Sequence, residues 1–465
     1  MGVCKPFIPQ SIVHIRTVMD NMEETSRDGF TSKRGFILSC IGSAVGMGNI
    51  WRFPIMVCIW GGLTFLIPYF IFVVLIASTG VISEFALGRS AGSGPIGAFG
   101  RCTQVGLGRR RLGERIGIIP VVGSLALAIG YTCVMAWVLK YTYMAFTGDL
   151  SAMGEDMAAI GGMFDSTASA WGANSWVLIT VLVTLLIMSL GVAGGIERAN
   201  KVMLPILYAL FIGLGIYIFT LPGSELGYEY ILTLDPAGLL NPLVWIFAFG
   251  QAFFSLSVAG NGSVIYGSYL SRKESIPNCA RYVALFDTIG AMMAAMVIIP
   301  AMAAAGGQLD TAGPGLMFIY LVQVFNGMAG GQVIGIVFFV CVTFAGLTSL
   351  INLYEAPVAY IQERFRKSRA LSSLVILAIG CAVALCIQAV VSDWMDAVSI
   401  YVCPLGALLA AVMFFWIAGR DYVLESVNEG SRKPIGRWFF PAGKYVYCTL
   451  AIVALVAGAL FGGIG

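Results

Sequence analysis

The chain has 465 residues, of which 58% are hydrophobic and only 11% are charged, and its net charge is +3. Apolar runs of about 20 residues recur along its whole length, a pattern typical of integral membrane proteins. The basic residues lie in short loops between these runs, which excludes a soluble nucleic-acid-binding protein. We therefore expect an all-α integral membrane protein whose large partner is the lipid bilayer.

Few residues of this chain could support enzyme chemistry. His14 is the only histidine, and most of the 11 cysteines lie in apolar segments, where a thiol behaves as a small hydrophobic group. Neither a disulfide framework nor a transition-metal site is predicted, and no catalytic constellation is found. Residues 1–33 are polar and charged, unlike a cleavable signal peptide. We expect a protein that is not an enzyme.

About 11 transmembrane helices are predicted from the apolar spans. In chain order the spans cover residues 35–58, 62–87, 117–147, 174–193, 202–221, 240–270, 280–304, 330–360, 371–391, 397–418 and 443–463. They divide the chain into an N-terminal cytoplasmic segment, two blocks of five helices, a cytoplasmic linker and an eleventh helix, at residues 1–34, 35–221, 240–418, 419–442 and 443–463.

The distribution of charge along the loops predicts the orientation. Lysine and arginine gather in every second connection, beginning with the N-terminal segment and the loop GRRRLGER, whereas the alternate connections carry acids such as Asp149, Glu155 and Asp310. Positive loops stay in the cytoplasm. We expect a multi-pass protein of the plasma (inner) membrane with a cytoplasmic N-terminus and, after eleven spans, a C-terminus outside.

The first span contains residues that break helices. GSAVGMGNIWRFP, residues 42–54, holds three glycines, a serine, an asparagine, an arginine and a proline. Small residues in a membrane helix often serve only to let a neighbouring helix pack closely. Here they are concentrated with polar side chains at the middle of the span, where unwound backbone needs partners in protein, ions or a water-filled cavity. The pattern favours a discontinuous helix at a binding site.

The sixth span is interrupted in a similar way. Ser255, Ser257, Gly260, Asn261 and Gly262 stand in the middle of residues 253–270. Interruptions at corresponding places in two successive blocks of five spans are typical of transporters built from inverted repeats, with the site at the membrane midplane. The expected fold is therefore a 5+5 inverted repeat with discontinuous helices 1 and 6.

Four motifs occur in order on the first, sixth, eighth and tenth spans: GSAVGMGNIWRFP, GQAFFSLSVAGNGSVIYGSYL, FAGLTSLINLYEAP and SDWMDAV. In these motifs the chain resembles the neurotransmitter:sodium symporter family, particularly its bacterial amino-acid transporters. The likeness runs from about Arg27 to Arg420. It implies the fold of that family and sodium-coupled uptake of an amino acid by alternating access. A channel or passive facilitator of similar topology is the alternative.

Sodium is the implied cofactor, at two sites. Hydroxyls such as those of Thr348 and Ser349 in a membrane helix usually bond back to their own helix, but sodium, a hard cation, also takes hydroxyl and carbonyl oxygens. The resemblance implies one site from the Thr348 and Ser349 hydroxyls with the carbonyls of Gly42, Val45 and Ala345. It implies a second site from the carbonyl of Ala44, the side chains of Asn49 and Asp287, and Ser255 through its hydroxyl and carbonyl.

The substrate site is implied by the same motifs. Relatives that carry monoamines resemble one another in having an aspartate at the position of Gly46, so glycine there implies a substrate that brings its own carboxylate, an amino acid. Tyr131 would donate its hydroxyl to that carboxylate, although a tyrosine on a helix face more often serves packing. The implied substrate-binding set is Ser43, Ala44, Gly46, Gly48, Tyr131, Phe254, Ser255, Ser257, Ala259 and Leu353. Ser43 and Gly260 replace bulkier residues of some relatives, which leaves the preferred side chain open.

Charged residues inside spans are costly and suggest gates. Arg52 and Asp396 resemble the outer gate pair of the family, although an arginine near a helix end can also simply extend to water. Glu84 and Glu355 are expected to accept hydrogen bonds from unwound backbone or to be protonated. The inner gate network implied by the resemblance consists of Arg27, Phe30, Tyr269 and Glu363.

Chloride is not expected to be required. In chloride-dependent relatives, the resemblance would place anion ligands at Tyr69, Gln251, Ser255 and a small polar residue at position 291, which here is Ala291. Asp287 lies one helical turn before Ala291 and can bring the missing negative charge. The particular amino acid, the sodium stoichiometry and the oligomeric state are not predicted.

Overall fold

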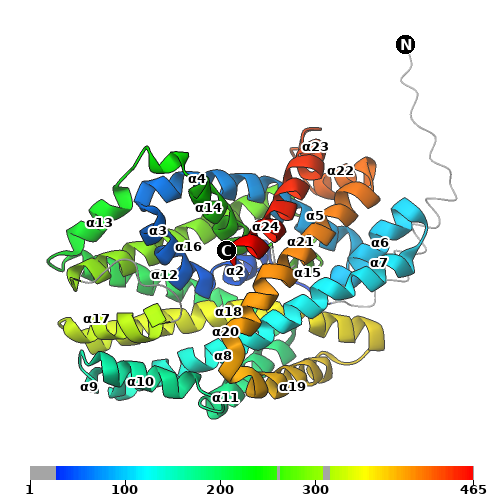
Figure 1. The fold of residues 1–465 in the computed structure, drawn as a ribbon. Helices are drawn as coiled ribbons and strands as arrows, with labels where there is room; N and C mark the ends of the chain where they lie inside the picture. The colour runs from blue at the N-terminus through cyan, green and yellow to red at the C-terminus, as the bar shows by residue number, and fades with distance from the viewer. Residues whose placement is uncertain (1–27, 259–261, 307–314, 464–465) are drawn as a thin grey trace.

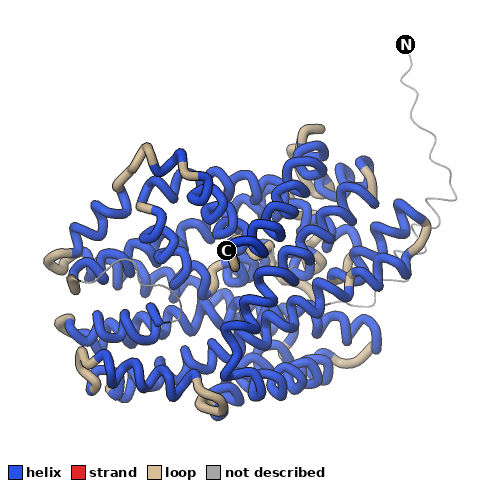
Figure 2. The backbone as a smooth tube through the Cα atoms, viewed as in Figure 1, coloured by secondary structure: helices blue, strands red, loops and turns tan. Residues whose placement is uncertain are grey.

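The computed structural model describes residues 28–258, 262–306 and 315–463, and within these ranges every regular element is a helix (Figure 2). The first half of the chain forms a series of helices that are mostly long and apolar (Figure 1). They are α2 (Lys33–Ala44), η1 (Gly48–Arg52), α3 (Phe53–Trp60), α4 (Gly62–Ile76), η2 (Ala77–Val81), α5 (Ile82–Ala91), α6 (Pro95–Leu107), α7 (Arg110–Ile116), α8 (Ile118–Thr147), α9 (Asp149–Ala152), α10 (Met157–Ala168), α11 (Asn174–Ser189), η3 (Val192–Glu197), α12 (Arg198–Phe219) and α13 (Ser224–Leu232).

The second half continues in the same manner. Its helices are η4 (Gly238–Leu240), α14 (Pro242–Ser255), α15 (Gly262–Gly267), α16 (Ile276–Ala304), η5 (Leu316–Tyr320), α17 (Leu321–Gly327), α18 (Gly331–Phe365), α19 (Arg369–Ile387), η6 (Gln388–Val390), α20 (Val391–Ala397), η7 (Val398–Val402), α21 (Cys403–Val412), η8 (Met413–Ile417), α22 (Arg420–Asn428), α23 (Phe439–Pro441), η9 (Ala442–Tyr447) and α24 (Cys448–Phe461).

Several of these helices are long and apolar enough to cross a membrane. Within the described residues there are seven by length and composition, or eight when the bent pair that contains α2 is counted as one span. Large apolar side chains such as Val74, Ile216 and Val333 are exposed on them, as expected of surfaces that face lipid. The chain is a multi-pass membrane protein, in agreement with its composition.

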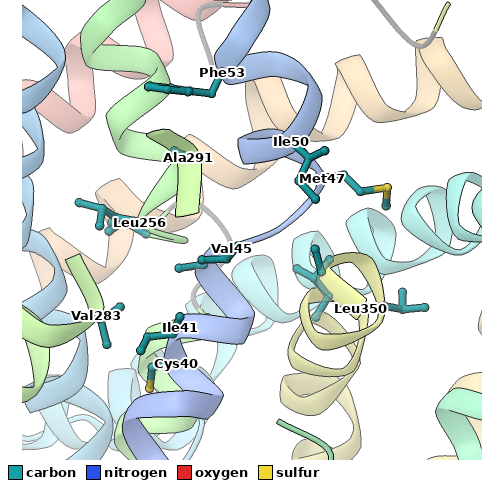
Figure 3. Packing of buried hydrophobic residues seen from close by; sticks show 14 of the residues in the cluster. Cys40, Ile41, Val45, Met47, Ile50, Phe53, Leu256, Val283, Ala291 and Leu350 are labelled. Atoms are coloured by element: carbon teal, nitrogen blue, oxygen red, sulfur yellow. The ribbon is translucent and has the colours of Figure 1, made fainter. Parts of the chain in front are cut away.

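The first predicted helix break is present. α2 ends at Ala44, and the helix resumes at Gly48 with its axis bent by 56°. Figure 3 shows the chain crossing from Val45 to Met47 as an extended segment, with apolar side chains around it. Glycine and serine in this stretch lower the cost of leaving the helix, while the hydroxyls of Tyr131, Ser257 and Ser349 bond to the freed backbone groups.

The second break lies at the end of α14. The helix stops at Ser255, and Ser257 adopts a left-handed backbone conformation with φ of 56°, which is rare for a residue other than glycine. α15 begins at Gly262, after residues 259–261, which lie outside the described residues. A strained non-glycine residue at such a point is a common feature of binding sites.

The two breaks face the centre of the molecule. α2 packs against α12, α16 and α18, and α8 runs along α18. α18 is the longest helix, with 35 residues, and its middle is buried. α2 therefore meets the continuous helices α12, α16 and α18 in the interior, and the end of α14 reaches α16 through the hydrogen bond from Ser255 to Asp287.

Candidate functional site

Asp287 of α16 connects the two interrupted helices. Its carboxylate is fully buried and accepts hydrogen bonds from Asn49 Nδ2 and from Ser255 Oγ, both at 2.7 Å. The Ala44 carbonyl accepts the Gly46 N–H at 2.8 Å, within the extended segment that precedes Asn49. The structure thus brings together the three side chains predicted for one sodium site, and they present carboxylate, amide and hydroxyl oxygens, which a hard cation prefers.

The hydroxyls predicted for the other sodium site lie on α18 beside the end of α2. Ser349 Oγ is 3.2 Å from the carbonyl oxygens of Gly42 and Ser43. Thr348 Oγ1 is 3.0 Å from the carbonyl oxygen of Ala345. Both hydroxyls bond to carbonyls, as hydroxyls in membrane helices commonly do, and the bond from Ser349 crosses between helices. Two hydroxyls and several carbonyls therefore share one buried region.

Gly46 must be small because of its neighbours. A Cβ atom at Gly46 would lie 2.7 Å from Ser349 Oγ and 2.9 Å from the Tyr131 hydroxyl. That hydroxyl also accepts the backbone N–H of Met47 at 2.9 Å, so its own proton is left to donate. Val45, the remaining predicted sodium ligand, directly precedes Gly46. The Tyr131 hydroxyl thus remains a hydrogen-bond donor beside the unwound segment, where the N–H groups of Gly46 and Met47 are already bonded.

The other predicted substrate residues border the same region. Ser257 Oγ donates to the Ser43 carbonyl at 3.0 Å, which joins the two breaks directly. Leu353 follows Ser349 by one turn of α18 and is buried, and Phe254 is half-buried at the end of α14. No described atom lies within 4 Å of a Cβ placed on Gly48. The predicted residues Ala259 and Gly260 lie outside the described residues.

The predicted outer gate pair is not joined in this structure. Among the described residues, no ion pair of 4.0 Å or less links Arg52 to Asp396, and Asp396 is exposed. Arg52 is half-buried, and its Nε has no hydrogen-bond partner. α20, which carries Asp396, is nevertheless fixed on α8, because Trp394 Nε1 donates to the Ala126 carbonyl at 2.7 Å. The sequence offered no signal for that bond.

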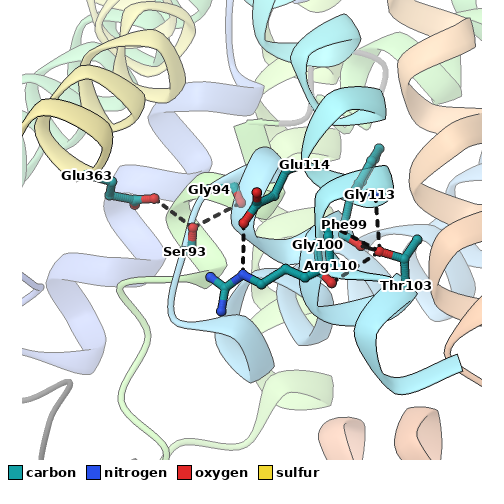
Figure 4. Close-up of polar contacts among 9 residues, drawn as sticks. All are labelled: Ser93, Gly94, Phe99, Gly100, Thr103, Arg110, Gly113, Glu114 and Glu363. Carbon is teal, nitrogen blue, oxygen red and sulfur yellow. Dashed lines mark hydrogen bonds and ion pairs between the residues drawn. The ribbon is translucent and has the colours of Figure 1, made fainter. Parts of the chain in front are cut away.

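Of the residues predicted for the inner gate, Phe30 and Tyr269 pack together, and Glu363 contacts Ser93. Phe30 packs edge-to-face against Tyr269, with ring centroids 6.2 Å apart, and against Phe36 and Tyr266. Figure 4 shows Glu363 at the end of α18 accepting a hydrogen bond from Ser93, 2.7 Å away, between α5 and α6. Arg27, also predicted here, lies outside the described residues.

The expectation for Glu355 is wrong. Its carboxylate does not accept backbone hydrogen bonds but forms a bidentate ion pair with Arg369, at 2.8 and 2.6 Å, and accepts the Tyr269 hydroxyl at 2.6 Å. An arginine partner favours the ionised carboxylate, so protonation is not needed either. Glu84, in contrast, is buried with neither carboxylate oxygen in a hydrogen bond to the described residues.

A second carboxylate network was missed by the sequence analysis. Glu197, at the end of η3, accepts the backbone N–H and the hydroxyl of Thr31 and the hydroxyl of Ser32, and pairs with Lys201 at 2.5 Å. Because Ser32 caps α2, these bonds fix the start of α2 to the start of α12. The inner ends of both helices are held together.

Two of the residues named for an anion site, Tyr69 and Ser255, lie near each other and near Asp287. Tyr69 and Gln251 are buried, and the Tyr69 hydroxyl and Gln251 Oε1 have no hydrogen-bond partner among the described residues. Ala291 is buried and offers no polar atom. The carboxyl group of Asp287 lies in this part of the molecule and is contacted by Ser255.

Comparisons with known proteins agree with this arrangement. The family model of the sodium:neurotransmitter symporter family matches residues 27–159 and 156–460. An uncharacterised sodium-dependent transporter of Methanocaldococcus jannaschii is 31% identical over 94% of this chain and 90% of its own. One of Bacillus subtilis is 30% identical over 94% of this chain and 97% of its own.

More distant similarities involve named transporters. The sodium-dependent neutral amino acid transporter B(0)AT3 of Mus musculus is 32% identical, over 60% of this chain and 48% of its own length. The crystal structure of MhsT in complex with L-phenylalanine superposes with a TM-score of 0.81 at 29% identity, over 93% of this chain and 100% of that chain. The fold is therefore the one that MhsT has.

Proposed function

Because the chain belongs to the sodium:neurotransmitter symporter family, we propose that it imports a neutral amino acid together with sodium by alternating access. The observation that carries this proposal is the meeting of two interrupted helices at Asp287, with Asn49 and Ser255 each 2.7 Å from its carboxylate. Buried oxygens that bridge unwound backbone are costly in a membrane unless they bind something.

Two sodium ions are proposed. One is held by Asn49, Ser255, Asp287 and the Ala44 carbonyl. The other is held by the hydroxyls of Thr348 and Ser349 with the carbonyls of Gly42, Val45 and Ala345. Support comes from Ser349, whose hydroxyl oxygen lies 3.2 Å from the carbonyl oxygens of Gly42 and Ser43 at the end of α2. If the hydroxyl proton turned away, a cation could bind the hydroxyl oxygen and a carbonyl oxygen together.

The substrate proposal rests on the surroundings of Gly46. An amino-acid carboxylate could accept a hydrogen bond from the Tyr131 hydroxyl, near the start of the half-helix that begins at Gly48, because half-helix N-termini favour anions. Phe254 and Leu353 provide an apolar surface near it, and none of the side chains proposed to touch the substrate's side chain is charged. These features, with the neutral amino acid named for the mouse relative and the L-phenylalanine in the MhsT complex, support a neutral amino acid.

The membrane arrangement is proposed from the loop charges. The N-terminus would lie in the cytoplasm and the C-terminus outside, in the plasma membrane, with residues 35–221 and 240–418 as the two inverted repeats of five helices. Breaks at the ends of α2 and α14, the first long helix of each block, support this division.

Transport is proposed to be independent of chloride. A carboxylate about 4 Å from a cation contributes on the order of 4 kcal/mol at an effective dielectric near 20, before desolvation is subtracted. Asp287 can therefore supply the charge that chloride supplies in other members. Replacing chloride by gluconate should leave uptake unchanged, whereas Asp287→Asn should abolish uptake or make it depend on chloride. A large loss of wild-type uptake in gluconate would contradict this role of Asp287.

The test of the main proposal is uptake into proteoliposomes. Radiolabelled neutral amino acids should accumulate above the outside concentration when an inward sodium gradient is present, and accumulation should collapse when potassium replaces sodium. Equal uptake in potassium would refute sodium symport. A channel or passive facilitator would instead equilibrate its solute without concentrating it, so the same assay separates the two functions.

A further inference from the structure

Asn200 on α12 carries a buried oxygen that nothing in the proposed mechanism uses. The side chain is 0% exposed, its Nδ2 donates to the Ile196 carbonyl at 2.9 Å, and its Oδ1 has no hydrogen-bond partner in the described part of the chain. The amide orientation is fixed by chemistry, because turning it over would set Oδ1 against the Ile196 carbonyl, with two acceptors facing each other.

The unpartnered oxygen lies beside Gly42, one of the residues proposed for the sodium site of α2 and α18. A Cβ atom on Gly42 would lie 2.1 Å from Asn200 Oδ1 and 3.0 Å from Thr348 Cβ, with Leu204 Cδ2 at 2.9 Å. Gly42 and Thr348 are both among the residues proposed to bind this ion. The absence of a side chain at Gly42 is what allows Asn200 to approach them.

Nearby hydroxyl protons are already committed. Thr348 Oγ1 donates to carbonyls of its own helix, including that of Ala345, and Ser349 Oγ donates toward Gly42 and Ser43. Leu204 closes another side with an apolar methyl group. A carbonyl oxygen that is buried without a donor is unfavourable, and a cation is the partner that would satisfy it.

We propose that Asn200 Oδ1 is a further oxygen ligand of the sodium ion held by Thr348 and Ser349, either in contact with the ion or through one ordered water. This inference rests on the proposed function and deepens it, because it adds α12 to a site otherwise built from α2 and α18. α12 would then sense whether this sodium is bound, since one of its side chains shares the ion with α2.

Sodium binding without amino acid tests this proposal. The full-length protein is heated in mixtures of sodium chloride and choline chloride, and the sodium concentration that gives half of the maximal rise in unfolding temperature is measured. Asn200→Leu keeps the side-chain size but removes the oxygen, and should raise that concentration about tenfold, as expected for losing one contact to a charged partner. Asn200→Asp keeps an oxygen at the same place and should leave it equal to or below the wild-type value.

Cys341→Ala provides the matched control. Cys341 is fully buried on α18, and its thiol contacts the Leu207 carbonyl of α12 at 3.9 Å, so the change disturbs the same helix contact without removing an oxygen from the site. This variant should unfold at lower temperature but keep the wild-type sodium concentration. If Cys341→Ala shifts it as much as Asn200→Leu does, the effect is packing and the proposal is overturned.

The outcomes separate this inference from the proposed function. Sodium that fails to stabilise the wild-type protein would refute the sodium sites themselves. Sodium that stabilises wild type and Asn200→Leu with the same half-maximal concentration would overturn the role of Asn200 alone. Should Asn200→Leu not fold, the Asn200→Asp variant decides. If residue 200 is a ligand, the carboxylate must increase the affinity for sodium. If residue 200 only packs, the buried, unpaired charge must lower the unfolding temperature and leave the affinity for sodium without an increase.

Discussion

Arg52 and Arg369 are both arginines placed beside the central site, at its proposed outer and inner ends, but they differ in their partners. Arg369 has a bidentate ion pair with Glu355 at 2.6 and 2.8 Å, which Tyr269 joins. Arg52 has no ion pair with Asp396 at 4.0 Å or less among the described residues. Polar bonds thus join the residues at the proposed inner end, whereas no ion pair joins the proposed outer pair among the described residues.

The difference extends to the helices that carry these residues. At the inner end the start of α2 is fixed by Glu197 through Thr31 and Ser32, and Lys33 pairs with Glu274 at 3.2 Å. At the proposed outer end α20 packs on α8, and Trp394 donates a hydrogen bond to the Ala126 carbonyl. The described residues thus form more polar bonds at the proposed inner end than at the proposed outer end.

The largest effect is expected when the inner pair is broken. Glu355→Gln would leave the Arg369 charge without its carboxylate partner. The site is buried, because the side chain of Glu355 is 0% exposed and that of Arg369 is 11% exposed. Removing one partner of a buried ion pair costs about 3 to 5 kcal/mol. Uptake should fall by more than about tenfold, and the unfolding temperature should drop.

Two further variants check this interpretation. Glu355→Gln combined with Arg369→Gln removes both charges and should recover part of the stability. Arg272→Gln breaks an exposed pair with Glu429, at 3.6 Å, and should change little. Wild-type uptake by Glu355→Gln would mean that the inner end is not held closed by this pair.

A smaller effect is expected from a methyl group between the two ends. Gly46→Ala places a Cβ 2.7 Å from Ser349 Oγ and 2.9 Å from the Tyr131 hydroxyl, so these groups must move apart. Overfilling a packed interior costs about 1 to 3 kcal/mol, and amino-acid affinity at saturating sodium should fall by about tenfold. Gly48→Ala adds the same atom where no described atom lies within 4 Å, and should keep the fold intact. Similar affinities for wild type and Gly46→Ala would show that Gly46 is not beside the substrate.

The outer pair should matter less. Arg52→Gln or Asp396→Asn removes a bond that this structure has not formed, and Asp396 is exposed, so the pair would form near water. Exposed ion pairs contribute at most about 1 kcal/mol, and uptake should slow by less than about fivefold while amino-acid binding is kept. Exchanging the two charges, with Arg52→Asp and Asp396→Arg, should restore part of the rate. Uptake at the wild-type rate in both single variants would indicate that Arg52 only extends toward water.

The sequence predicted the breaks in the helices better than the partners of the charged side chains. The break after Ala44 followed from glycines and polar residues in an apolar span, because unwound backbone at that depth needs particular residue types. The convergence of Asn49, Ser255 and Asp287 followed from the family resemblance. Gly42 and Gly46 were placed at the site, but the side chains that approach them belong to other helices, and a single sequence does not show which.

Charged residues near helix ends were harder to interpret. The fifth span was expected to begin at residue 202, whereas η3 and α12 continue the helix from Val192, because Glu197 and Lys201 satisfy each other and Glu197 also binds Thr31. Arg369 likewise stands at the end of a run of basic residues just before the predicted span 371–391, and the sequence shows no partner for Glu355. Hydropathy does not show which charged side chains pair with each other. A charged residue in a buried ion pair is therefore assigned to a loop at the end of a span, or treated as an isolated charge.

The smallest effect is expected from the bond that holds α20. Trp394→Phe removes the hydrogen bond from Nε1 to the Ala126 carbonyl, at 2.7 Å, but keeps an aromatic ring against α8. One such bond contributes about 0.5 to 1.5 kcal/mol, so α20 should loosen without unfolding the protein, and uptake should change by about twofold. Because α20 carries Asp396, the change should add little to Arg52→Gln if both act only on outer closure. If uptake by Trp394→Phe falls as much as uptake by Glu355→Gln, the proposed outer end depends on bonds as strong as those of the proposed inner end. The difference between Arg52 and Arg369 would then not describe how the two ends are held.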